Sequence, residues 1–337
     1  MLKLLASYLR KDFLAKPIDY IIFVTNRCNS RCIHCFNWKN INKLSESELT
    51  FEEFEKFSGE IGRIRNLSIS GGEPFLREDL PELIILFSKN NQPESINIPT
   101  NCLLGKKIVP IAEKFLKKRL PVDYTISLSL DGLKKTHEHI RGVLGNFEKV
   151  LETYKALIPL RKKYDLKIKI STTLNKRNIN EIKELGKYVK KNMPEVDFHN
   201  FEIMRGNPKD KTLHPPDYDE LVKLKPIIFK IWKDYQFYGK SKKSLIAYQL
   251  KKYVYNTYLE IIKEKRQVVP CLAYSFDTVL DAYGNIYLCE LTPVVGNIRK
   301  NSFIQILKSK MPEKGDYLFA EGNATAPIPV LCKKAFF

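Results

Sequence analysis

Short apolar runs alternate with longer amphipathic segments along most of the chain. The runs are rich in Ile, Leu and Val, as is typical of buried strands. We expect six strands, at residues 18–24, 67–70, 96–98, 124–130, 166–174 and 196–204. Apolar residues at helical spacing predict helices at 51–64, 79–90, 146–163 and 178–192. Strands that alternate with helices in this way predict a parallel sheet.

The ends of these segments carry their own signals. Thr50, with Glu53 three residues later, predicts a capping box at the start of the first helix. Polar or Gly-rich residues follow nearly every expected strand. In parallel barrels the chemistry gathers at the carboxyl ends of the strands, so we expect the functional residues there.

The segments before and after the alternating strands and helices have different sequence patterns. Residues 1–17 have Leu2, Leu5 and Leu9 at helical spacing among lysines and arginines, which predicts a basic amphipathic helix that stops at Pro17. That helix would pack on the barrel or lie on a membrane surface as a peripheral contact. Residues 206–265 begin with a proline-rich connector, and long helices at 217–236 and 243–265 then form a helical bridge.

The composition argues against a membrane-spanning protein and against a disulfide-rich secreted protein. The chain has 337 residues, 44% of them hydrophobic, and no apolar run near the roughly 18 residues that a membrane span needs. Seven cysteines without a dense disulfide framework favour a reducing, cytoplasmic setting. The 57 basic and 38 acidic residues give a net charge of +19, which favours acidic, phosphorylated or anionic lipid partners. We expect no specific nucleic acid partner, because the chain has no nucleic-acid-binding motif.

Three cysteines stand directly after the first expected strand. Cys28, Cys32 and Cys35 have the spacing C-x3-C-x2-C. Three thiolates in one loop can hold three irons of a 4Fe-4S cube and leave the fourth iron open to a small molecule. A zinc knuckle with His34 as the fourth ligand is the alternative, although His34 lies awkwardly between two of the cysteines.

A second motif, Gly71-Gly72-Glu73-Pro74, follows the second expected strand. With the cysteine loop in this order, the chain resembles the radical SAM enzymes, in which His34 would fill a slot usually held by an aromatic residue. The resemblance implies an α/β fold, a partial (β/α)6 TIM-like barrel over residues 18–205. It also implies that a 5′-deoxyadenosyl radical forms by reductive cleavage of S-adenosylmethionine (SAM). A reducing electron donor such as flavodoxin or ferredoxin would be a partner.

The resemblance also implies roles for single residues. Gly71 and Gly72 would let the backbone approach SAM, and Glu73 would help to place its amino group. Arg141 would pair with the SAM carboxylate. Further contacts to SAM would come from His34, Ser129, Asp131 and Asn175. For Ser129, Asp131, Arg141 and Asn175 the alternative is turn chemistry or helix capping. Cys102 stands where relatives often have Gly, and we expect it to be a small packed residue.

A second group of cysteines lies near the C-terminus. Residues 279–289 predict a hairpin with its turn at 283–285. The pattern resembles the SPASM and twitch domains of radical SAM enzymes, and residues 266–337 would form such a small α+β domain. The resemblance implies an auxiliary 4Fe-4S cluster held by Cys271, Cys289 and Cys332. The alternative is three buried thiols in an ordinary cap domain.

Several functions therefore stay open. The leading hypothesis is a radical SAM oxidoreductase or maturase that performs a two-electron oxidation or a cross-link. Its substrate could be a small molecule, a peptide, or a phosphorylated or lipid-linked compound. The rival hypothesis from another class is a non-catalytic, zinc-stabilised basic module.

Overall fold

The computed structural model describes residues 17–43, 47–235, 242–269 and 276–310. The expected N-terminal helix, Cys271 and Cys332 lie outside the described residues. The strands are β1 (Asp19–Thr25), β2 (Asn66–Gly71), β3 (Ser95–Thr100), β4 (Asp123–Ser129), β5 (Lys167–Leu174), β6 (Phe198–Ile203), β7 (Asp277–Leu280), β8 (Asn285–Tyr287) and β9 (Gly296–Asn297). The helices are α2 (Phe51–Ile61), α3 (Leu80–Asn90), α4 (Ile108–Leu116), α5 (Lys134–Arg141), α6 (Asn146–Tyr164), α7 (Ile182–Asn192), α8 (Tyr218–Lys233), α9 (Lys242–Glu264) and α11 (Phe303–Lys310).

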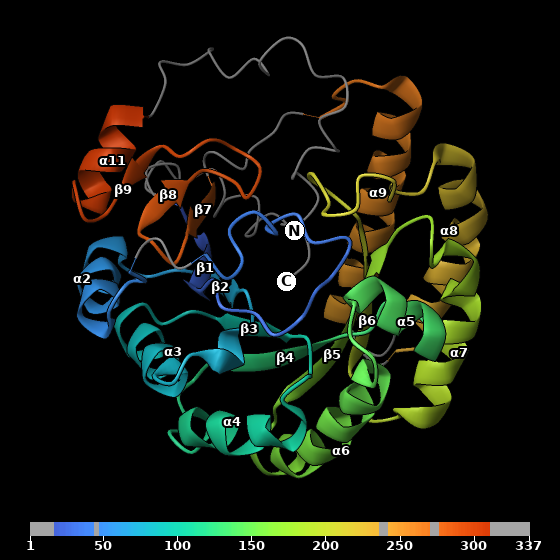
Figure 1. Cartoon of the computed structure of the whole chain (residues 1–337), viewed down its shortest axis with the longest axis horizontal. Coiled ribbons are helices and arrows are strands. Elements are labelled where there is room, and N and C mark those ends of the chain that lie inside the picture. Colours follow the sequence, from blue (N-terminus) through green and yellow to red (C-terminus); the bar gives the residue numbers. More distant parts are fainter. Residues whose placement is uncertain (1–16, 44–46, 236–241, 270–275, 311–337) are drawn as a thin grey trace.

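One curved sheet organises the molecule, in the order β6-β5-β4-β3-β2-β1-β7-β8-β9. Strands β1 to β6 are parallel, as the strand–helix alternation predicts. Helices α2, α3, α4, α6 and α7 form an outer layer around the arc of strands (Figure 1). The sheet does not close, because β6 and β9 are its two edges. This is the mixed α/β fold of a partial barrel.

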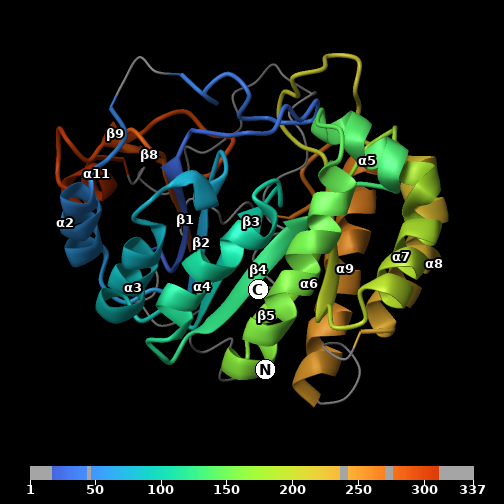
Figure 2. The ribbon, with the colours of Figure 1, turned by 60° about the horizontal axis from the view of Figure 1, so that its bottom comes forward.

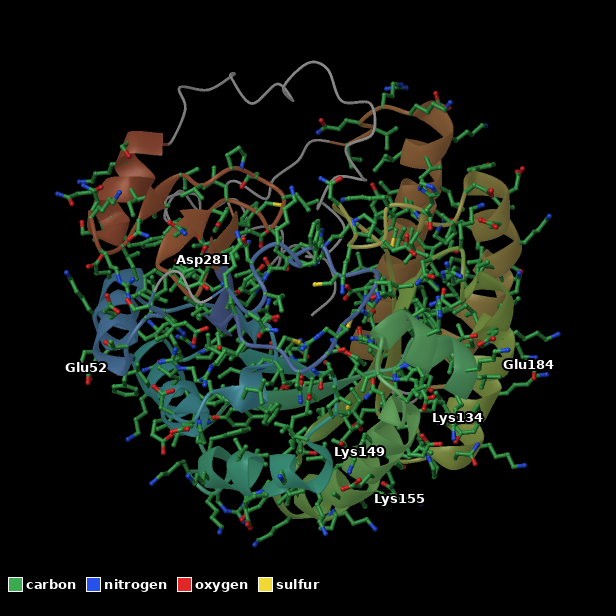
Figure 3. All side chains as sticks on the ribbon, viewed as in Figure 1. Glu52, Lys134, Lys149, Lys155, Glu184 and Asp281 are labelled. Carbon is green, nitrogen blue, oxygen red and sulfur yellow. The ribbon has the colours of Figure 1, made fainter. Side chains whose placement is uncertain are left out.

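The outer face of the sheet is the hydrophobic core. Ile22, Ile69, Ile98 and Ile126 lie on successive strands and are fully buried against the helices. Every second residue of a strand points to the same face, so this face alone is apolar. Charged residues of the helices point away from it, as Lys155 of α6 and Glu184 of α7 do in Figure 3. The helical layer and the sheet behind it are seen from another side in Figure 2.

The C-terminal hairpin shares this sheet. Strand β7 pairs in parallel with β1, and β8 turns back antiparallel to β7. Gly284 in the turn has φ +88°, a conformation that glycine adopts without strain. The expected hairpin is therefore present, and it extends the barrel sheet at the β1 edge. The division of the chain at residue 266 into a core and a second domain stays a prediction.

The structure confirms several local predictions from the sequence, but two of its helices were not predicted. Thr50 and Glu53 form the expected capping box at the start of α2. Cys102 is fully buried, as expected for a small packed residue, and its φ of +65° lies in the left-handed region that favours glycine. Sequence periodicity missed α4 and α5, which have nine and eight residues and so present few turns of any pattern. No helix in the described parts of the chain is long and apolar enough to span a membrane.

Candidate functional site

The cysteine loop is anchored on two glycines of the neighbouring strand. Gly72 N donates to Thr25 O at 2.7 Å, and Glu73 N donates to Arg27 O at 2.8 Å. A Cβ atom on Gly71 would lie 2.2 Å from Thr25 O, and one on Gly72 would lie 2.2 Å from Arg27 O. No side chain fits at those separations. The two glycines are therefore required by the backbone of the cysteine loop itself.

The three thiols of the loop lie within electrostatic reach of one another. Burial raises the pKa of Cys28 to about 11, and Cys32 contributes to the shift. Burial raises the pKa of Cys35 to about 12, with Cys32 as the next largest cause. Cys35 N also donates to Cys32 O at 3.3 Å, in a tight turn. The loop thus gathers its sulfur atoms at the mouth of the barrel.

Helix α5 holds the other side of the loop. Arg31 N donates to Arg141 O at 3.1 Å, and Ile33 N donates to Ile140 O at 2.9 Å. Ser30 Oγ donates to the same Arg141 carbonyl at 3.0 Å and lies 3.0 Å from Cys32 Sγ. The loop therefore sits against the last turn of α5, whose carbonyls are not used within the helix.

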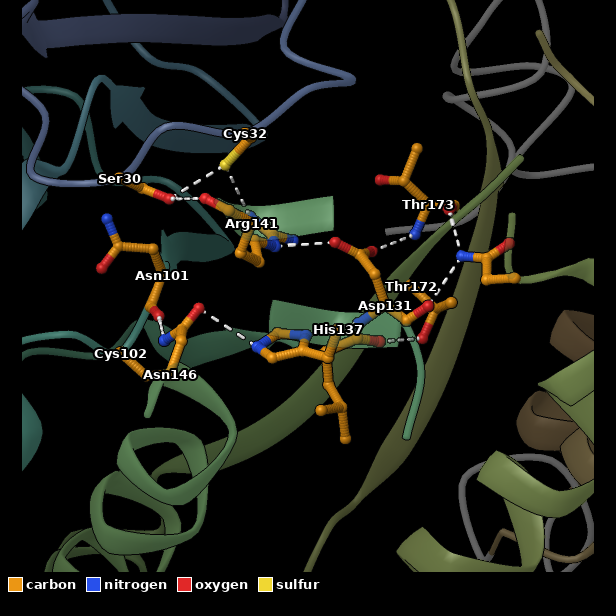
Figure 4. Close-up of polar contacts among 12 residues, drawn as sticks. Ser30, Cys32, Asn101, Cys102, Asp131, His137, Arg141, Asn146, Thr172 and Thr173 are labelled. Atoms are coloured by element: carbon orange, nitrogen blue, oxygen red, sulfur yellow. Dashed lines mark hydrogen bonds and ion pairs between the residues drawn. The ribbon is translucent and has the colours of Figure 1, made fainter. Parts of the chain in front are cut away.

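Arg141 lies between a buried carboxylate and a cysteine sulfur (Figure 4). Its Nε forms an ion pair with Asp131 Oδ2 at 2.7 Å, and its Nη1 donates to Cys32 Sγ at 3.8 Å. Thr173 N donates to the other oxygen of Asp131 at 2.8 Å. Burial is the largest single effect and would raise the pKa of Asp131. The charge of Arg141, the two nearby histidines and the hydrogen bond from Thr173 N together exceed it, and the pKa falls. Asp131 is therefore an anion that fixes Arg141.

A neutral histidine links Asp131 to the end of β3. Asp131 N donates to His137 Nδ1 at 3.0 Å, so the ring proton is on Nε2. Nε2 then donates to Asn146 Oδ1 at 3.1 Å, and Asn146 Nδ2 donates to Asn101 O at 2.9 Å. Burial lowers the pKa of His137 to about 4, which keeps it uncharged. This chain of contacts fixes the relative positions of β3, β4 and α5.

Glu73 and Asn101 complete the wall opposite Arg141. Asn101 N donates to Glu73 Oε2 at 2.7 Å, and Phe75 N donates to Glu73 Oε1 at 3.4 Å. Asn101 Nδ2 donates to Cys28 Sγ at 3.8 Å and to Asn29 Oδ1 at 2.8 Å. Burial raises the pKa of Glu73 to about 7. Glu73 thus positions backbone groups beside the loop, and Asn101 points its amide at a sulfur.

His34, Ser129 and Asn175, the other residues expected to contact SAM, lie in different parts of the site. His34 is inside the loop; its Nδ1 is buried with no hydrogen-bond partner in the described structure, and burial lowers its pKa to about 4. Ser129 ends β4 beside Asp131. Asn175 is buried in an Asx turn, in which Arg177 N donates to its Oδ1 at 3.0 Å. The turn chemistry considered for Asn175 is therefore present.

Sequence reasoning missed several residues of this site: Ser30, Asn101, His137, Asn146 and Arg205. Asn101 had a usable signal, since it follows a strand at the same edge of the sheet. Arg205 lies two residues beyond the end of β6 and forms an ion pair with Glu290, the residue after Cys289. Cys289 is buried, and Leu291 N donates to its Sγ at 3.4 Å.

The residues at the mouth fit a 4Fe-4S cluster. Cys28 and Cys32 each accept a hydrogen bond from a polar side chain, Asn101 and Arg141 respectively, which is the kind of contact that tunes iron–sulfur clusters. Among the described residues, no three His, Cys, Asp or Glu side chains converge on one metal ion. A cube spreads its cysteines over different irons, so a cluster of this kind does not require the three sulfur atoms to converge on one point.

Comparison with known proteins identifies the superfamily. Residues 22–189 match the model of the Radical SAM superfamily. The chain is 28% identical over 306 residues to the AdoMet-dependent heme synthase of Methanosarcina barkeri, covering 84% of this chain and 80% of that protein. It is 27% identical to the GTP 3′,8-cyclase of Clostridium perfringens, covering 69% and 70%.

Solved structures agree in fold. Streptococcus suis SuiB bound to the precursor peptide SuiA aligns with a TM-score of 0.62 at 17% identity, covering 91% of this chain and 68% of SuiB. Native anSMEcpe with AdoMet and the Cp18Cys peptide aligns with a TM-score of 0.60 at 20% identity, covering 87% and 81%. The cysteine loop, the Gly-Gly-Glu turn and the matched domain together show that this chain belongs to the radical SAM superfamily.

Proposed function

We propose that this protein is an enzyme that binds a 4Fe-4S cluster through Cys28, Cys32 and Cys35, and SAM beside it. When bound, this pair supplies a 5′-deoxyadenosyl radical that removes a hydrogen atom from a substrate carbon. The observation that carries the proposal is that two thiols of the cysteine loop accept hydrogen bonds from Asn101 and Arg141 at the carboxyl ends of the strands. Family membership disfavours the alternative of a non-catalytic zinc module.

The chain's own residues prepare this site in three ways. Gly71 and Gly72 bring β2 against the cysteine loop, which fixes the edge where SAM would bind. Glu73 orders the Asn101 amide and the turn at Phe75. Asp131 holds Arg141 in place, so the rest of the guanidinium can face the carboxylate of SAM. His34, Ser129 and Asn175 are weaker candidates for contacts to SAM.

A second part of the proposal concerns the C-terminal cysteines. We infer an auxiliary 4Fe-4S cluster held by Cys271, Cys289 and Cys332, of which only Cys289 lies in the described part of the chain. Arg205 and Glu290, beside Cys289, are candidates for the missing fourth ligand or for substrate contact. With such a cluster as electron acceptor, the net reaction would be a two-electron oxidation or a cross-link of the substrate.

The names of the relatives cover different substrates. One is named for heme synthesis and one for the cyclisation of GTP, and both solved structures hold peptides. A peptide, a phosphorylated compound and a lipid-linked compound therefore remain alternative substrates. A cytoplasmic location with a flavodoxin or ferredoxin as reductant suits the reducing setting that this chemistry needs.

Anaerobic reconstitution tests the proposal. Iron and sulfide would be counted, and the chain would then be incubated with dithionite and SAM. We expect 5′-deoxyadenosine from the wild type and from Cys102→Ala, a matched control because the buried Cys102 thiol donates to Thr100 O and not to the loop. Cys32→Ala should give none. Zinc without sulfide, or no 5′-deoxyadenosine from the wild type, would overturn the proposal.

The number of irons per chain tests the auxiliary cluster separately. Two cubes correspond to about eight irons per chain and one cube to about four. Cys289→Ala should lower the iron content of the reconstituted chain by about half while Cys102→Ala leaves it unchanged. A wild type with about four irons would remove the auxiliary cluster from the proposal and leave the rest intact.

A further inference from the structure

The cysteine loop is closed into a ring by a residue that follows it in the chain. The loop begins at Asn26, directly after β1, and Asn42 N donates to Asn26 O at 2.9 Å. The ring of backbone between these two residues contains Cys28, Cys32 and Cys35. Closing a loop removes much of the conformational freedom of the residues inside it. Asn42 therefore helps to fix where the three sulfur atoms lie.

The side chain of Asn42 also reaches across the ring to Cys28. Cys28 N donates to Asn42 Oδ1 at 2.9 Å, and Asn42 Nδ2 donates to Cys28 O at 2.9 Å. A carboxamide presents a donor and an acceptor side by side, as the backbone of a neighbouring strand would. One side chain thus pairs with both the N–H and the C=O of Cys28, and it holds the backbone of that residue instead of its sulfur atom.

The backbone conformation at residue 42 suits asparagine. Its φ is +57°, in the left-handed region, and Asn is one of the residues other than glycine that adopt this region most often. Asn42 is exposed, so it is not part of the hydrophobic core. The hydrogen bonds that the structure gives it end on Asn26 and Cys28. Both the conformation and the contacts of Asn42 therefore serve the cysteine loop.

A second contact holds Cys28 at its sulfur atom. Asn101 Nδ2 donates to Cys28 Sγ at 3.8 Å and to Asn29 Oδ1 at 2.8 Å. Cys28 is thus fixed from two sides, by Asn42 at its backbone and by Asn101 at its sulfur. Cys32 is supported differently, since its sulfur accepts a hydrogen bond from α5. The support of Cys28 therefore depends on a residue that does not support Cys32.

A glutamate anchors the same part of the chain to the end of β1. Asn26 N donates to Glu48 Oε1 at 2.7 Å, and Thr25 Oγ1 donates to the same oxygen at 2.8 Å. Asn26 therefore donates to Glu48 with its N–H and accepts from Asn42 with its carbonyl. Both anchoring residues follow Cys35 in the chain. The segment after the cysteine loop thus folds back and supports the start of the loop.

We propose that Asn42 is the positioning residue of the cluster ligand Cys28: its amide holds the Cys28 backbone so that the sulfur meets Asn101. Residues that orient a metal ligand commonly change metal affinity by about 10–100-fold when they are replaced. Hydrogen bonds to the sulfur atoms also affect the reduction potential of an iron–sulfur cluster. The inference rests on the proposed function for the cluster, but the two hydrogen bonds to Cys28 do not need the cluster.

Iron release from the reconstituted full chain tests the inference. The chain would be transferred anaerobically into an iron chelator, and the release rate and the midpoint potential would be measured. We expect release to be about tenfold faster in Asn42→Gly, Asn42→Ala and Asn42→Asp. Glycine keeps the left-handed backbone without the amide, and aspartate keeps only the acceptor. The midpoint potential should become more negative, because the sulfur of Cys28 is held less firmly against its donor Asn101.

Asn40→Ala is the matched control. Asn40 lies in the same segment and its Nδ2 donates to Asn37 Oδ1 at 2.9 Å, but no hydrogen bond described for it reaches a cysteine. Its loss should leave the release rate and the midpoint potential unchanged. A wild-type release rate in Asn42→Gly would mean that only the backbone conformation matters, and it would overturn the inference. Equal acceleration in Asn40→Ala would overturn it too.

Alkylation of the chain without iron separates this inference from the proposed function. Cys28 should react faster with iodoacetamide in Asn42→Gly than in the wild type, with Cys35 of the same chain as the reference in peptide mass spectrometry. Unchanged alkylation of Cys28 would overturn the inference even where the wild type holds a cluster. A wild type that holds no cluster would overturn the proposed function, while faster alkylation in Asn42→Gly would still show that Asn42 positions Cys28.

Discussion

Arg205 and Glu290 form an ion pair across the mouth of the barrel, with 2.5 Å between Nη2 and Oε2. They are 85 residues apart in the chain, one just beyond the end of β6 and the other beside Cys289. The Arg205 guanidinium also lies 5.5 Å from the centroid of the Phe36 ring, next to Cys35. The pair therefore joins three segments of the open barrel at one point.

Removing one partner of this pair should destabilise the fold. The side chains are only 20% and 7% exposed, so Arg205→Met would leave a largely buried carboxylate without its main counter-charge. We expect a loss of about 2–4 kcal/mol in the free energy of unfolding, measured by urea titration. The double variant Arg205→Met/Glu290→Leu should recover at least half of the loss. Losses that simply add in the double variant would show that the pair does not couple the segments.

The Asp131–Arg141 pair predicts a second effect on stability. Asp131 is fully buried, and Asp131→Asn would remove the charge that balances Arg141. We expect a loss of about 3 kcal/mol in the free energy of unfolding. Asp165→Asn is the control, because Asp165 pairs with Lys167 while its own side chain is 84% exposed, and its loss should change stability by under about 0.5 kcal/mol. Similar effects of both variants would contradict the role of Asp131.

Features of this molecule that depend on neighbouring residues in the sequence could be predicted, and contacts between distant segments could not. The six parallel strands could be predicted because each apolar run is local, as at Ile22 or Ile126. The cysteine loop and the Gly-Gly-Glu turn could be predicted because each motif is contiguous. Arg205–Glu290 and Asn101–Cys28 could not, because they depend on which strand ends meet in space. Ser68, Asn97, Thr125 and Lys167 lie side by side on four strands because of the register of the sheet, which sequence patterns fix only weakly.

Glu73 predicts a pH-dependent contribution to stability. Its pKa is about 7 in the fold and 4.5 as the ordinary value, so the folded chain binds this proton more tightly. The contribution is complete below pH 4.5 and is lost as the pH rises through about 7. The difference in the free energy of unfolding between wild type and Glu73→Gln should therefore change by about 3 kcal/mol between pH 4.5 and pH 8.

Urea titrations of both chains across this pH range would measure the change for Glu73. Subtracting the Glu73→Gln values removes the other titrating groups, which the two chains share. A difference that stays constant with pH would mean that Glu73 is ionised in the fold. In that case its carboxylate would carry a charge beside the loop.

The last prediction concerns the two glycines under the cysteine loop. An added methyl group at Gly71 or Gly72 would come within 2.2 Å of a backbone oxygen, and backbone cannot move aside as a side chain can. Gly71 also has φ +133°, which an alanine does not adopt without strain. Gly71→Ala and Gly72→Ala should therefore each destabilise the chain by at least about 3 kcal/mol and displace the loop.

Gly59→Ala is the matched control for that experiment. Gly59 lies in α2, and a Cβ atom there would meet nothing within 4 Å, so the change should stabilise the chain by about 0.5–1 kcal/mol. Iron content after reconstitution is the second readout, and it should fall in the Gly71 and Gly72 variants but not in Gly59→Ala. If Gly71→Ala kept full stability but lost SAM binding, the glycine would serve the cofactor and not the loop. Loss of iron together with stability would instead place its role in the contact with Thr25.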